Sequence, residues 1–344
     1  MQKKEEYNLK RLFVIVLMPL VIAACCLIDD DMSVCGEELM ITYQLQLHTE
    51  LSLQLETELY ADYDRPVREA LQEWLAPIFT DVAQDIDLRF YSRDIDDLRH
   101  QIQEVINDNR TSYTIYLPQE NYMHLAVANI VDNYQVRFLG GEHSESMELR
   151  MPDKSHIDPL NTGIFTARLP MHVNDSVRFF DVHLYMVNSA VAVIFDVMDC
   201  PNLASIEGVT TDCSECFHVK DSSFTYASPR TFNMINIALR SGAEAPALRG
   251  VKAEDEVTDT RCLGTVCMPT PDKQPWHIEF VTTMADGEQT KTTLEIEQPL
   301  KAGTLRIIRC RLGSKGEVVP MTQDIGTSVD LDWHGGDNGH EIEI

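Results

Sequence analysis

Apolar and polar residues alternate from Leu39 to Leu55 in this chain. Leucine, isoleucine and tyrosine occupy most of the odd positions, and threonine, glutamine, histidine and serine occupy most of the even ones. Successive side chains of a β-strand point to opposite faces, so this period buries one set and exposes the other. The segment is long enough for one bent strand or two strands. It predicts that the folded part of the chain begins as β structure.

Further strands are expected along the rest of the chain, because their residues alternate in the same way or are enriched in β-branched and aromatic types. The expected strands are Ile86–Tyr91, Tyr113–Leu117, Met123–Val131, Gly163–Leu169, two strands within Val177–Val197 around Asn188-Ser189, strands with long loops within Cys200–Cys267, and His277–Thr283, Thr290–Ile296, Leu305–Cys310 and Val329–Trp333. The dipeptide Asp286-Gly287 between two alternating segments is typical of a β-hairpin.

Two helices are expected among the early strands. From Val67 to Ile78, apolar residues recur at three- and four-residue steps and form one stripe. Asp64 is a candidate N-cap, and Pro77 limits the far end. A second, short helix is expected over Asp94–Ile106, while the polar segment Gly140–Pro159 is expected to be a loop or a helical excursion. Short helices inserted into a mostly β chain indicate a sandwich with a helical crossover.

The chain has 344 residues, of which 44% are hydrophobic. At about 100–200 residues per domain, this length predicts two domains. The texture of the sequence changes near Asp175, so we expect an N-terminal domain over 37–175 and a C-terminal domain over 176–334. The Gly- and Asp-rich residues 335–344 are expected to be a flexible tail.

The first residues have the layout of a secretory signal peptide. Four basic residues precede an apolar segment, Leu12–Ile22, which spans 11 residues and contains Pro19. A membrane-spanning helix needs about 20 apolar residues, so this segment is too short to be one. Residues 1–24 are therefore expected to be removed from the mature protein.

The predicted cleavage site carries a second signal. The sequence Ile22-Ala23-Ala24-Cys25 resembles the bacterial lipobox, in which small residues precede a cysteine that is acylated before cleavage. Several acyl chains on Cys25 would hold the protein stably on a membrane. The alternative is an ordinary signal peptide followed by a chance cysteine.

Residues 25–36 are expected to be a tether. Within it, Asp29-Asp30-Asp31 resembles the signal that sends some Bacteroidetes lipoproteins to the outer face of the outer membrane. A solvated charge run is the alternative for these aspartates.

The charge balance excludes one class of partner. The chain carries 28 lysines and arginines against 55 aspartates and glutamates, which gives a net charge of −27. Nucleic-acid binding needs a cationic surface to replace the counterions of the phosphates, so no nucleic-acid partner is expected.

Nine cysteines are many for a protein of a reducing compartment, and they indicate an oxidising one. Eight remain besides Cys25, with a connectivity that the sequence leaves open: Cys26, Cys35, Cys200, Cys213, Cys216, Cys262, Cys267 and Cys310. Disulfides or buried free thiols are the expected state. Zinc on Cys213, Cys216 and His218, with Cys262 and Cys267 as a second pair, is a weaker alternative because the spacing of the second pair is poor. We expect no metal site and no cofactor.

No catalytic motif of the GxSxG, P-loop, GxGxxG or HExxH type occurs, and we expect the protein not to be an enzyme. The clustered acids Asp94, Asp96 and Asp97 lack the spacing of an EF-hand. Single histidines in strand-like segments are expected to be structural or at the surface: His48, His124, His172 and His183. Trp74 is expected in the core, whereas Trp276 and Trp333 remain candidates for glycan contacts.

Four short segments resemble the fimbrium-anchoring subunits of type V pili in Bacteroidales. They are Cys25–Cys35 with its aspartates, Leu117–Asn129 with its Pro-containing turn and apolar strand, Asp158–Arg168, and the closing segment Gly326–Trp333. The resemblance implies two tandem transthyretin-like β-sandwich domains with short helical insertions. The cysteine groups near Cys213 and Cys262 have no firm counterpart in that family.

The resemblance also implies a function. It predicts a lipid-anchored cell-surface structural protein, a pilus anchor or minor subunit, whose partners are pilus shaft subunits and the outer membrane. Subunits of such pili join by strand addition, which suits an unpaired sheet edge. The segments Leu39–Leu55 and Val329–Trp333 are the candidates for exchanged or edge strands. The alternative is a surface lipoprotein that binds glycans or a host protein.

Overall fold

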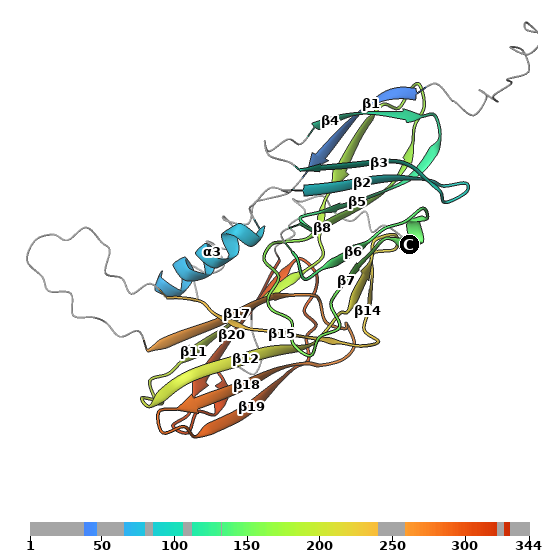
Figure 1. Ribbon diagram of the computed structural model, residues 1–344. Coiled ribbons are helices and arrows are strands. Elements are labelled where there is room, and N and C mark those ends of the chain that lie inside the picture. Colours follow the sequence, from blue (N-terminus) through green and yellow to red (C-terminus); the bar gives the residue numbers. More distant parts are fainter. Residues whose placement is uncertain are drawn as a thin grey trace, which may run out of the picture.

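The computed structural model describes residues 38–46, 65–79, 85–105, 112–131, 133–239, 259–321 and 327–330. They form a mostly β protein whose strands gather into two large groups and one small sheet (Figure 1). This confirms the predicted class, a β-sandwich protein with little helix. Within the described residues, no helix has both the length and the apolar character needed to cross a membrane.

The N-terminal group of strands forms two sheets, of order β4-β1-β9 and β10-β8-β5-β2-β3. Its strands are β1 (Glu38–Gln46), β2 (Asp85–Ser92), β3 (Leu98–Val105), β4 (Ser112–Pro118), β5 (Asn121–Ala128), β8 (Phe165–His172), β9 (Phe179–His183) and β10 (Tyr185–Met186). The alternation that predicted β1 is visible in the burial, since Leu39 and Ile41 are buried while Met40 is exposed. The apolar positions of the sequence thus form the inner faces of these sheets.

The C-terminal group also forms two sheets, of order β16-β17-β11-β20-β21, with β22 added to β20, and β15-β12-β18-β19. Its strands are β11 (Ser189–Asp196), β12 (Leu203–Cys213), β15 (Arg230–Asn233), β16 (Ile235–Asn236), β17 (Thr260–Cys267), β18 (Trp276–Met284), β19 (Gln289–Ile296), β20 (Thr304–Leu312), β21 (Val318–Pro320) and β22 (Thr327–Asp330). The predicted hairpin at Asp286-Gly287 is confirmed, because it joins β18 to β19.

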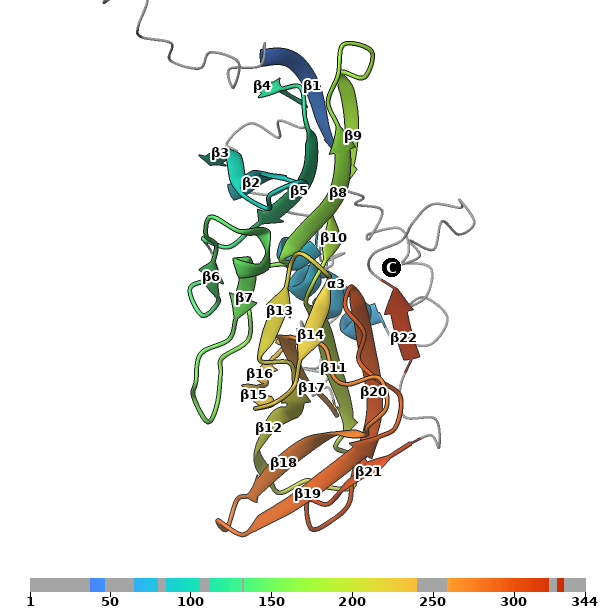
Figure 2. The ribbon, with the colours of Figure 1, turned by 90° about the vertical axis from the view of Figure 1, so that its right-hand side faces the viewer.

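A third sheet has the order β14-β13-β7-β6. Two of its strands, β6 and β7, precede β8 in the sequence, and the other two, β13 and β14, follow β12. Its strands are β6 (Arg137–Leu139), β7 (Glu148–Arg150), β13 (Cys216–His218) and β14 (Ser223–Thr225). Figure 2 shows it beside the junction of the two large groups. The segment Gly140–Pro159, expected to be a loop or helical excursion, contains both β7 and a short 3-10 helix, Ser144–Ser146.

One expected helix is a strand. Asp94–Ile106 contains β3, which pairs with β2 along its whole length. The apolar spacing from Leu98 to Ile102 is four residues, which fits a helix and a strand equally. The strand prevails because the side chains of Gln101 and Gln103 both donate hydrogen bonds to the Asp87 carboxylate on β2, at 3.0 and 2.5 Å.

The other expected helix is confirmed as α3 (Arg65–Phe79), which lies at the junction of the two large groups (Figure 1). Its Trp74 ring packs against Gly264 of β17, where an added Cβ would meet the ring at 2.7 Å. Gly264 therefore has no room for a side chain. At the end of α3, the amide of Gly163 donates to the Ile78 carbonyl at 2.7 Å.

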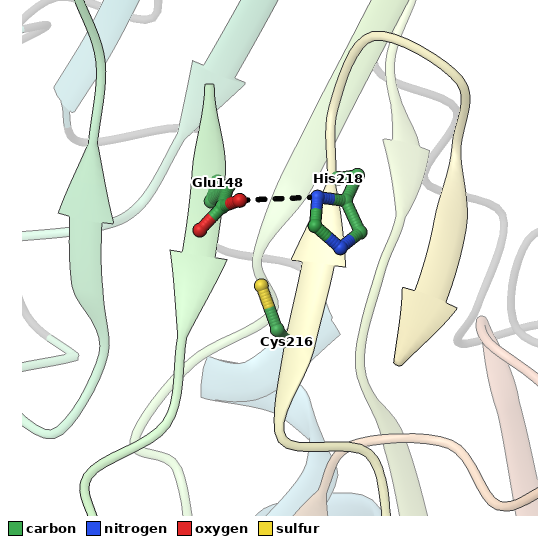
Figure 3. A group of neighbouring side chains, drawn as sticks. All are labelled: Glu148, Cys216 and His218. Carbon is green, nitrogen blue, oxygen red and sulfur yellow. Dashed lines mark ion pairs between the residues drawn. The ribbon is translucent and has the colours of Figure 1, made fainter. Parts of the chain in front are cut away.

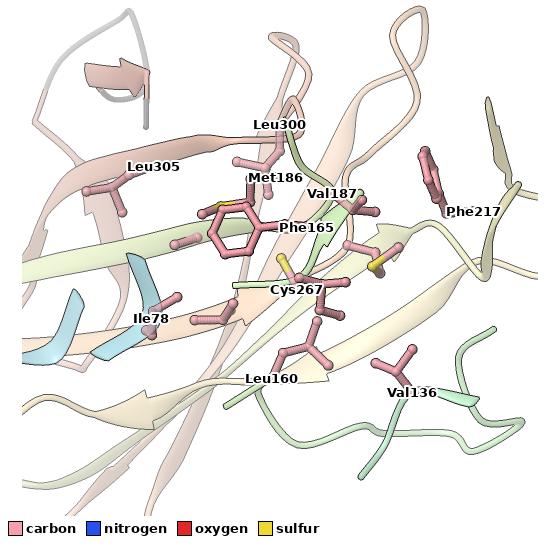
Figure 4. Close-up of a cluster of buried hydrophobic side chains, with 14 of the residues drawn as sticks. Ile78, Val136, Leu160, Phe165, Met186, Val187, Phe217, Cys267, Leu300 and Leu305 are labelled. Atoms are coloured by element: carbon pink, nitrogen blue, oxygen red, sulfur yellow. The ribbon is translucent and has the colours of Figure 1, made fainter. Parts of the chain in front are cut away.

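The buried residues form a core that is continuous between the two large groups. Figure 4 shows Ile78 of α3, Phe165 of β8 and Leu305 of β20 in one apolar cluster. A hydrogen-bonded amide reinforces this junction: Asn188 donates to the Thr162 carbonyl at 3.0 Å and accepts from the Ile164 amide at 2.9 Å.

The division into domains at residue 175 stays a prediction. The strands β9 and β10, which follow that position, pair with β1 and β8 of the N-terminal group. The strand pairing therefore changes from one group to the other between Met186 and Ser189.

Candidate functional sites

The predicted lipid-bearing residue, Cys25, lies outside the described residues, together with Cys26, Cys35 and the aspartates Asp29–Asp31. Lipid attachment at Cys25 and the signal peptide 1–24 stay predictions. The described residues offer two other places to examine for function. One is the edge strand β22, and the other is the group of cysteines and histidines.

The last described strand, β22, lies on an edge of the C-terminal group. It pairs antiparallel with β20, and its register runs from Thr304 opposite Asp330 to Ile307 opposite Thr327. The other edge of β20 is paired in parallel with β11. Further along the same edge, β21 pairs with Cys310–Leu312. The chain thus covers one edge of β20 with two short strands from its own C-terminal part.

The other candidate segment is not an edge strand over its described part. β1 lies between β4, to which it is antiparallel, and β9, to which it is parallel. The pairing with β4 covers Glu38–Gln44 and the pairing with β9 covers Thr42–Gln46, so both edges are paired within the chain at Thr42–Gln44. The rest of the candidate segment, residues 47–55, lies outside the described residues, as does Trp333.

The two cysteines of the CxxC motif point in different directions. The thiol of Cys213 lies beside that of Cys267, and burial next to this neighbour raises its pKa well above the usual value. The backbone agrees, because the amide of Ser214 donates to the carbonyl of Pro269 at 2.8 Å. All six described cysteines are buried and free. The zinc site predicted as an alternative, on Cys213, Cys216 and His218 with Cys262 and Cys267, is not formed among the described residues.

Cys216 instead joins Glu148 and His218 (Figure 3). Its strand β13 pairs with β7 in a register that sets His218 opposite Glu148 and Cys216 opposite Arg150. The Glu148 carboxylate oxygen Oε1 lies 3.3 Å from His218 Nδ1. Burial raises the pKa of the Cys216 thiol to about 11, and the nearby Glu148 carboxylate adds to this effect.

The sequence pointed to Cys216 and His218 but missed Glu148. Glu148 lies in a segment without clear periodicity, and nothing in the local sequence links it to a residue almost seventy positions later. Only the pairing of β7 with β13 brings the three side chains together. A pairing between strands so far apart in the chain cannot be predicted from one sequence.

The remaining candidates have structural partners. His124 is buried, with Nδ1 3.0 Å from the Arg89 carbonyl, while His172 and His183 lie at the surface. Asp96 contacts Ser144 and Lys220, so it ties its turn to the small third sheet. Trp276 is buried, and its indole donates to the Gln298 carbonyl at 2.8 Å. It therefore offers no platform for a sugar.

Solved structures of proteins from Bacteroides species have a similar fold. No protein-family model matches the chain, and no curated protein matches its sequence. A structure described as an adhesin candidate from Bacteroides thetaiotaomicron matches 86% of this chain and 98% of its own, with a TM-score of 0.54 at 11% identity.

Two other solved structures also match this chain, one with a TM-score above 0.5 and one below it. A structure described as a candidate polysaccharide-binding protein from the same species matches 84% of this chain and all of its own, with a TM-score of 0.52 at 12% identity. The fimbrial anchor protein Mfa2 from Porphyromonas gingivalis matches 80% of this chain and 90% of its own at 10% identity, but its TM-score is only 0.46. At these identities the two matches with TM-scores above 0.5 establish the fold alone.

Proposed function

We propose that this protein is a lipid-anchored structural component of the cell surface, a pilus anchor or minor subunit that attaches a fimbrial shaft to the outer membrane. The lipid on Cys25 is the attachment to the membrane, and the protein has no enzymatic activity. Three features support the proposal: the lipobox, the short segments that resemble fimbrium-anchoring subunits, and the fold shared with proteins described as adhesins.

The position of β22 carries the assembly part of the proposal. A strand at a sheet edge is held by one row of main-chain hydrogen bonds, so another strand of matching register can replace it. β22 covers only Thr304–Ile307 of β20, and six residues, 321–326, separate it from the end of β21 in the sequence. Departure of β22 would open this part of β20 to a strand from a shaft subunit, while β11 keeps the other edge paired.

Locking β22 onto β20 tests strand addition. We propose Thr304→Cys with Asp330→Cys, since these residues are opposite each other. The cross-linked protein is expected to lose association with fimbriae, and a reductant is expected to restore it. A matched control is Thr283→Cys with Gln289→Cys, which cross-links the β18–β19 hairpin. Full association of the locked β22 variant would overturn strand addition at this edge.

Labelling with palmitate tests the anchor. Wild-type protein is expected to incorporate the label and to fractionate with the outer membrane, and Cys25→Ala is expected to lose both properties. A Cys26→Ala variant is the matched control, because its thiol is adjacent but outside the lipobox spacing. Label retained by Cys25→Ala would rule out the proposed site. Normal retention of fimbriae on cells that lack the gene would rule out the anchor role.

The second candidate function is glycan binding, which one observation favours: a matching structure is described as a candidate polysaccharide-binding protein. Because Trp276 is buried, exposed tyrosines such as Tyr116 and Tyr134 are the remaining stacking surfaces. A glycan array distinguishes the two functions, since a structural anchor is expected to give no hits. Adjacent pilin genes would favour the anchor, and adjacent genes for transporters and polysaccharide-degrading enzymes would favour glycan binding.

A further inference from the structure

The small third sheet carries a group of three different metal-binding side chains. One ligand atom each from Glu148, Cys216 and His218 lies within 4.8 Å of the other two. Among the described residues, this is the only group of three or more such side chains. From these contacts we infer that the group is a binding site for a zinc-type divalent cation, held by the Glu148 carboxylate, the Cys216 thiolate and His218 Nδ1. The inference does not depend on the proposed function.

The backbone sets the three side chains on one face. β7 and β13 are antiparallel neighbours, and Cys216 and His218 are two residues apart on β13, so both point to the same side of the sheet as Glu148. The turn before β13 is held firmly: Ser214 Oγ donates to the Cys216 carbonyl at 2.9 Å, and the Met151 amide donates to the Glu215 carbonyl at 2.8 Å. The site is therefore built on paired strands rather than on a free loop.

The distances suit a tetrahedral ion. With metal–nitrogen and metal–oxygen bonds of about 2.0–2.1 Å, two ligand atoms of a tetrahedron lie about 3.3 Å apart. The separation of Glu148 Oε1 and His218 Nδ1 is 3.3 Å. The longer metal–sulfur bond of about 2.3 Å places the thiolate slightly farther from the other two atoms. The Cys216 thiol lies within 4.8 Å of both.

The neighbours of the group orient the ligands. His218 Nε2 lies 2.9 Å from the Thr225 hydroxyl on β14, so the ring can keep its proton on Nε2 and present Nδ1 to the metal. Arg150 binds the other oxygen of Glu148, Oε2, at 2.7 Å. This ion pair turns Oε1 toward His218. The positive charge of Arg150 weakens the attraction for a cation, but its side chain is half exposed and screened by water.

The chemistry of the donors selects the ion. A thiolate and an imidazole favour zinc and similar borderline metals, whereas calcium and magnesium take oxygen ligands. Binding displaces the thiol proton of Cys216 into solvent, and no electron is transferred. Three protein ligands leave a fourth position for water, which the partial exposure of His218 allows. The bound ion would link β7 to β13 and thus two segments that are distant in the sequence.

Titration with cobalt(II) chloride tests the site, because cobalt occupies zinc sites and a thiolate ligand gives it a charge-transfer absorption band. The mature chain, without a histidine tag and kept reduced, is expected to bind one equivalent with this band, and zinc chloride is expected to displace it. Cys216→Ser is expected to lose the band, and Glu148→Gln and His218→Gln are expected to weaken binding at least tenfold. Cys213→Ser, in which the other cysteine of the motif is replaced, is expected to keep the band.

A second measurement covers the case in which Cys216→Ser fails to fold. His218 is partly exposed, so His218→Gln is expected to fold, and zinc is expected to raise the midpoint of thermal unfolding of the wild type but not of this variant. The inference is overturned if cobalt binds without a thiolate band, if the band survives in Cys216→Ser, or if His218→Gln and the wild type respond equally to zinc.

Discussion

The N-terminal and C-terminal groups of strands share an architecture but bury different polar chemistry. The N-terminal group buries the ion pair of Asp87 and Arg89 and the histidine His124, and its described strands contain no cysteine. The described C-terminal part, from Cys200 to Cys310, buries six thiols. Two sandwiches built alike can therefore respond to different conditions. We expect the first to be sensitive to acid and to loss of charge, and the second to oxidation.

The largest expected effect is on the buried ion pair of the N-terminal group. Arg89 Nε donates to Asp87 Oδ1 at 2.8 Å, and its guanidinium lies against Gly140 and over the ring of Phe138. Arg89→Met leaves a buried carboxylate without its counter-charge, which typically costs about 3–5 kcal/mol. We expect the variant to lose about 3 kcal/mol of the free energy of unfolding, measured in urea. This is the lower end of the range, because Gln101 and Gln103 still donate to Asp87.

The control for this prediction removes both charges. Replacing a buried pair by apolar side chains of similar volume is often neutral. Asp87→Leu combined with Arg89→Met is therefore expected to recover most of the lost free energy of unfolding. If the double variant is as unstable as Arg89→Met alone, the loss comes from the packing of Arg89 on Phe138 and Gly140 rather than from an uncompensated charge.

The matching change in the C-terminal group is oxidation. The thiols of Cys213 and Cys267 are neighbours, so an added disulfide oxidant is expected to join them, with loss of one hydrogen from each sulfur. A disulfide stabilises by about 2–4 kcal/mol, chiefly through the unfolded chain. We expect oxidation to raise the free energy of unfolding, measured in urea, by about 3 kcal/mol. We also expect the mass of the protein to fall by two hydrogens.

Cys267→Ser is the matched control for oxidation, and it is expected to show neither change. Oxidation that leaves the mass of the wild type unaltered would show that the two thiols cannot meet in the required geometry. Oxidation that stabilises Cys267→Ser equally would point to another pair of cysteines.

The sequence predicted the features of these two regions that depend on neighbouring residues. It did not predict those that depend on pairing between distant segments. The period of two in Leu39–Gln46, the stripe of α3 and the Asp286-Gly287 turn are local signals, and the structure confirms all three. The strand β3 was misassigned because a four-residue apolar spacing fits both structures. Its pairing with β2 decides the matter, and that pairing is not local.

The candidate site shows the same limit. The motif Cys213–Cys216 suggested two cysteines acting together, as cysteines at this spacing do when both lie in one loop around a metal. In the structure β12 ends at Cys213 and β13 begins at Cys216, so the two side chains belong to different sheets. Glu148 comes from a distant strand and was invisible in the sequence, and the sequence did not show which of Cys262 and Cys267 lies beside Cys213.

Acid is expected to destabilise the N-terminal group through His124. Burial lowers the pKa of this histidine to about 4, so the folded protein keeps the ring neutral. Between pH 6.5 and 4 the unfolded chain binds the proton more strongly, and the free energy of unfolding therefore falls as the pH is lowered. We expect a loss of about 2 kcal/mol between pH 8 and pH 5 from this residue.

The measurement is urea unfolding at both pH values. His124→Gln is expected to be less stable at pH 8 but to lose about 2 kcal/mol less between pH 8 and pH 5 than the wild type. His183→Gln, which changes an exposed histidine, is expected to keep the dependence of the wild type. Equal pH dependence in all three proteins would show that the acid sensitivity has another origin, such as the carboxylates.

The smallest expected effect concerns backbone conformation at two residues with a positive φ, one in each group of strands. The N-terminal group places Asn129 at a φ of +62° after β5, and its side chain donates to the Gly163 carbonyl at 2.9 Å. The C-terminal group places Gly287 at a φ of +88° between β18 and β19, where an added Cβ would meet no atom within 4 Å. Gly287→Ala therefore changes backbone strain alone, and we expect it to cost about 1 kcal/mol in urea unfolding. Gly287→Asn is expected to cost less, because asparagine tolerates this conformation as it does at position 129. If alanine and asparagine cost the same, the cost of replacing glycine at this turn does not come from the positive φ.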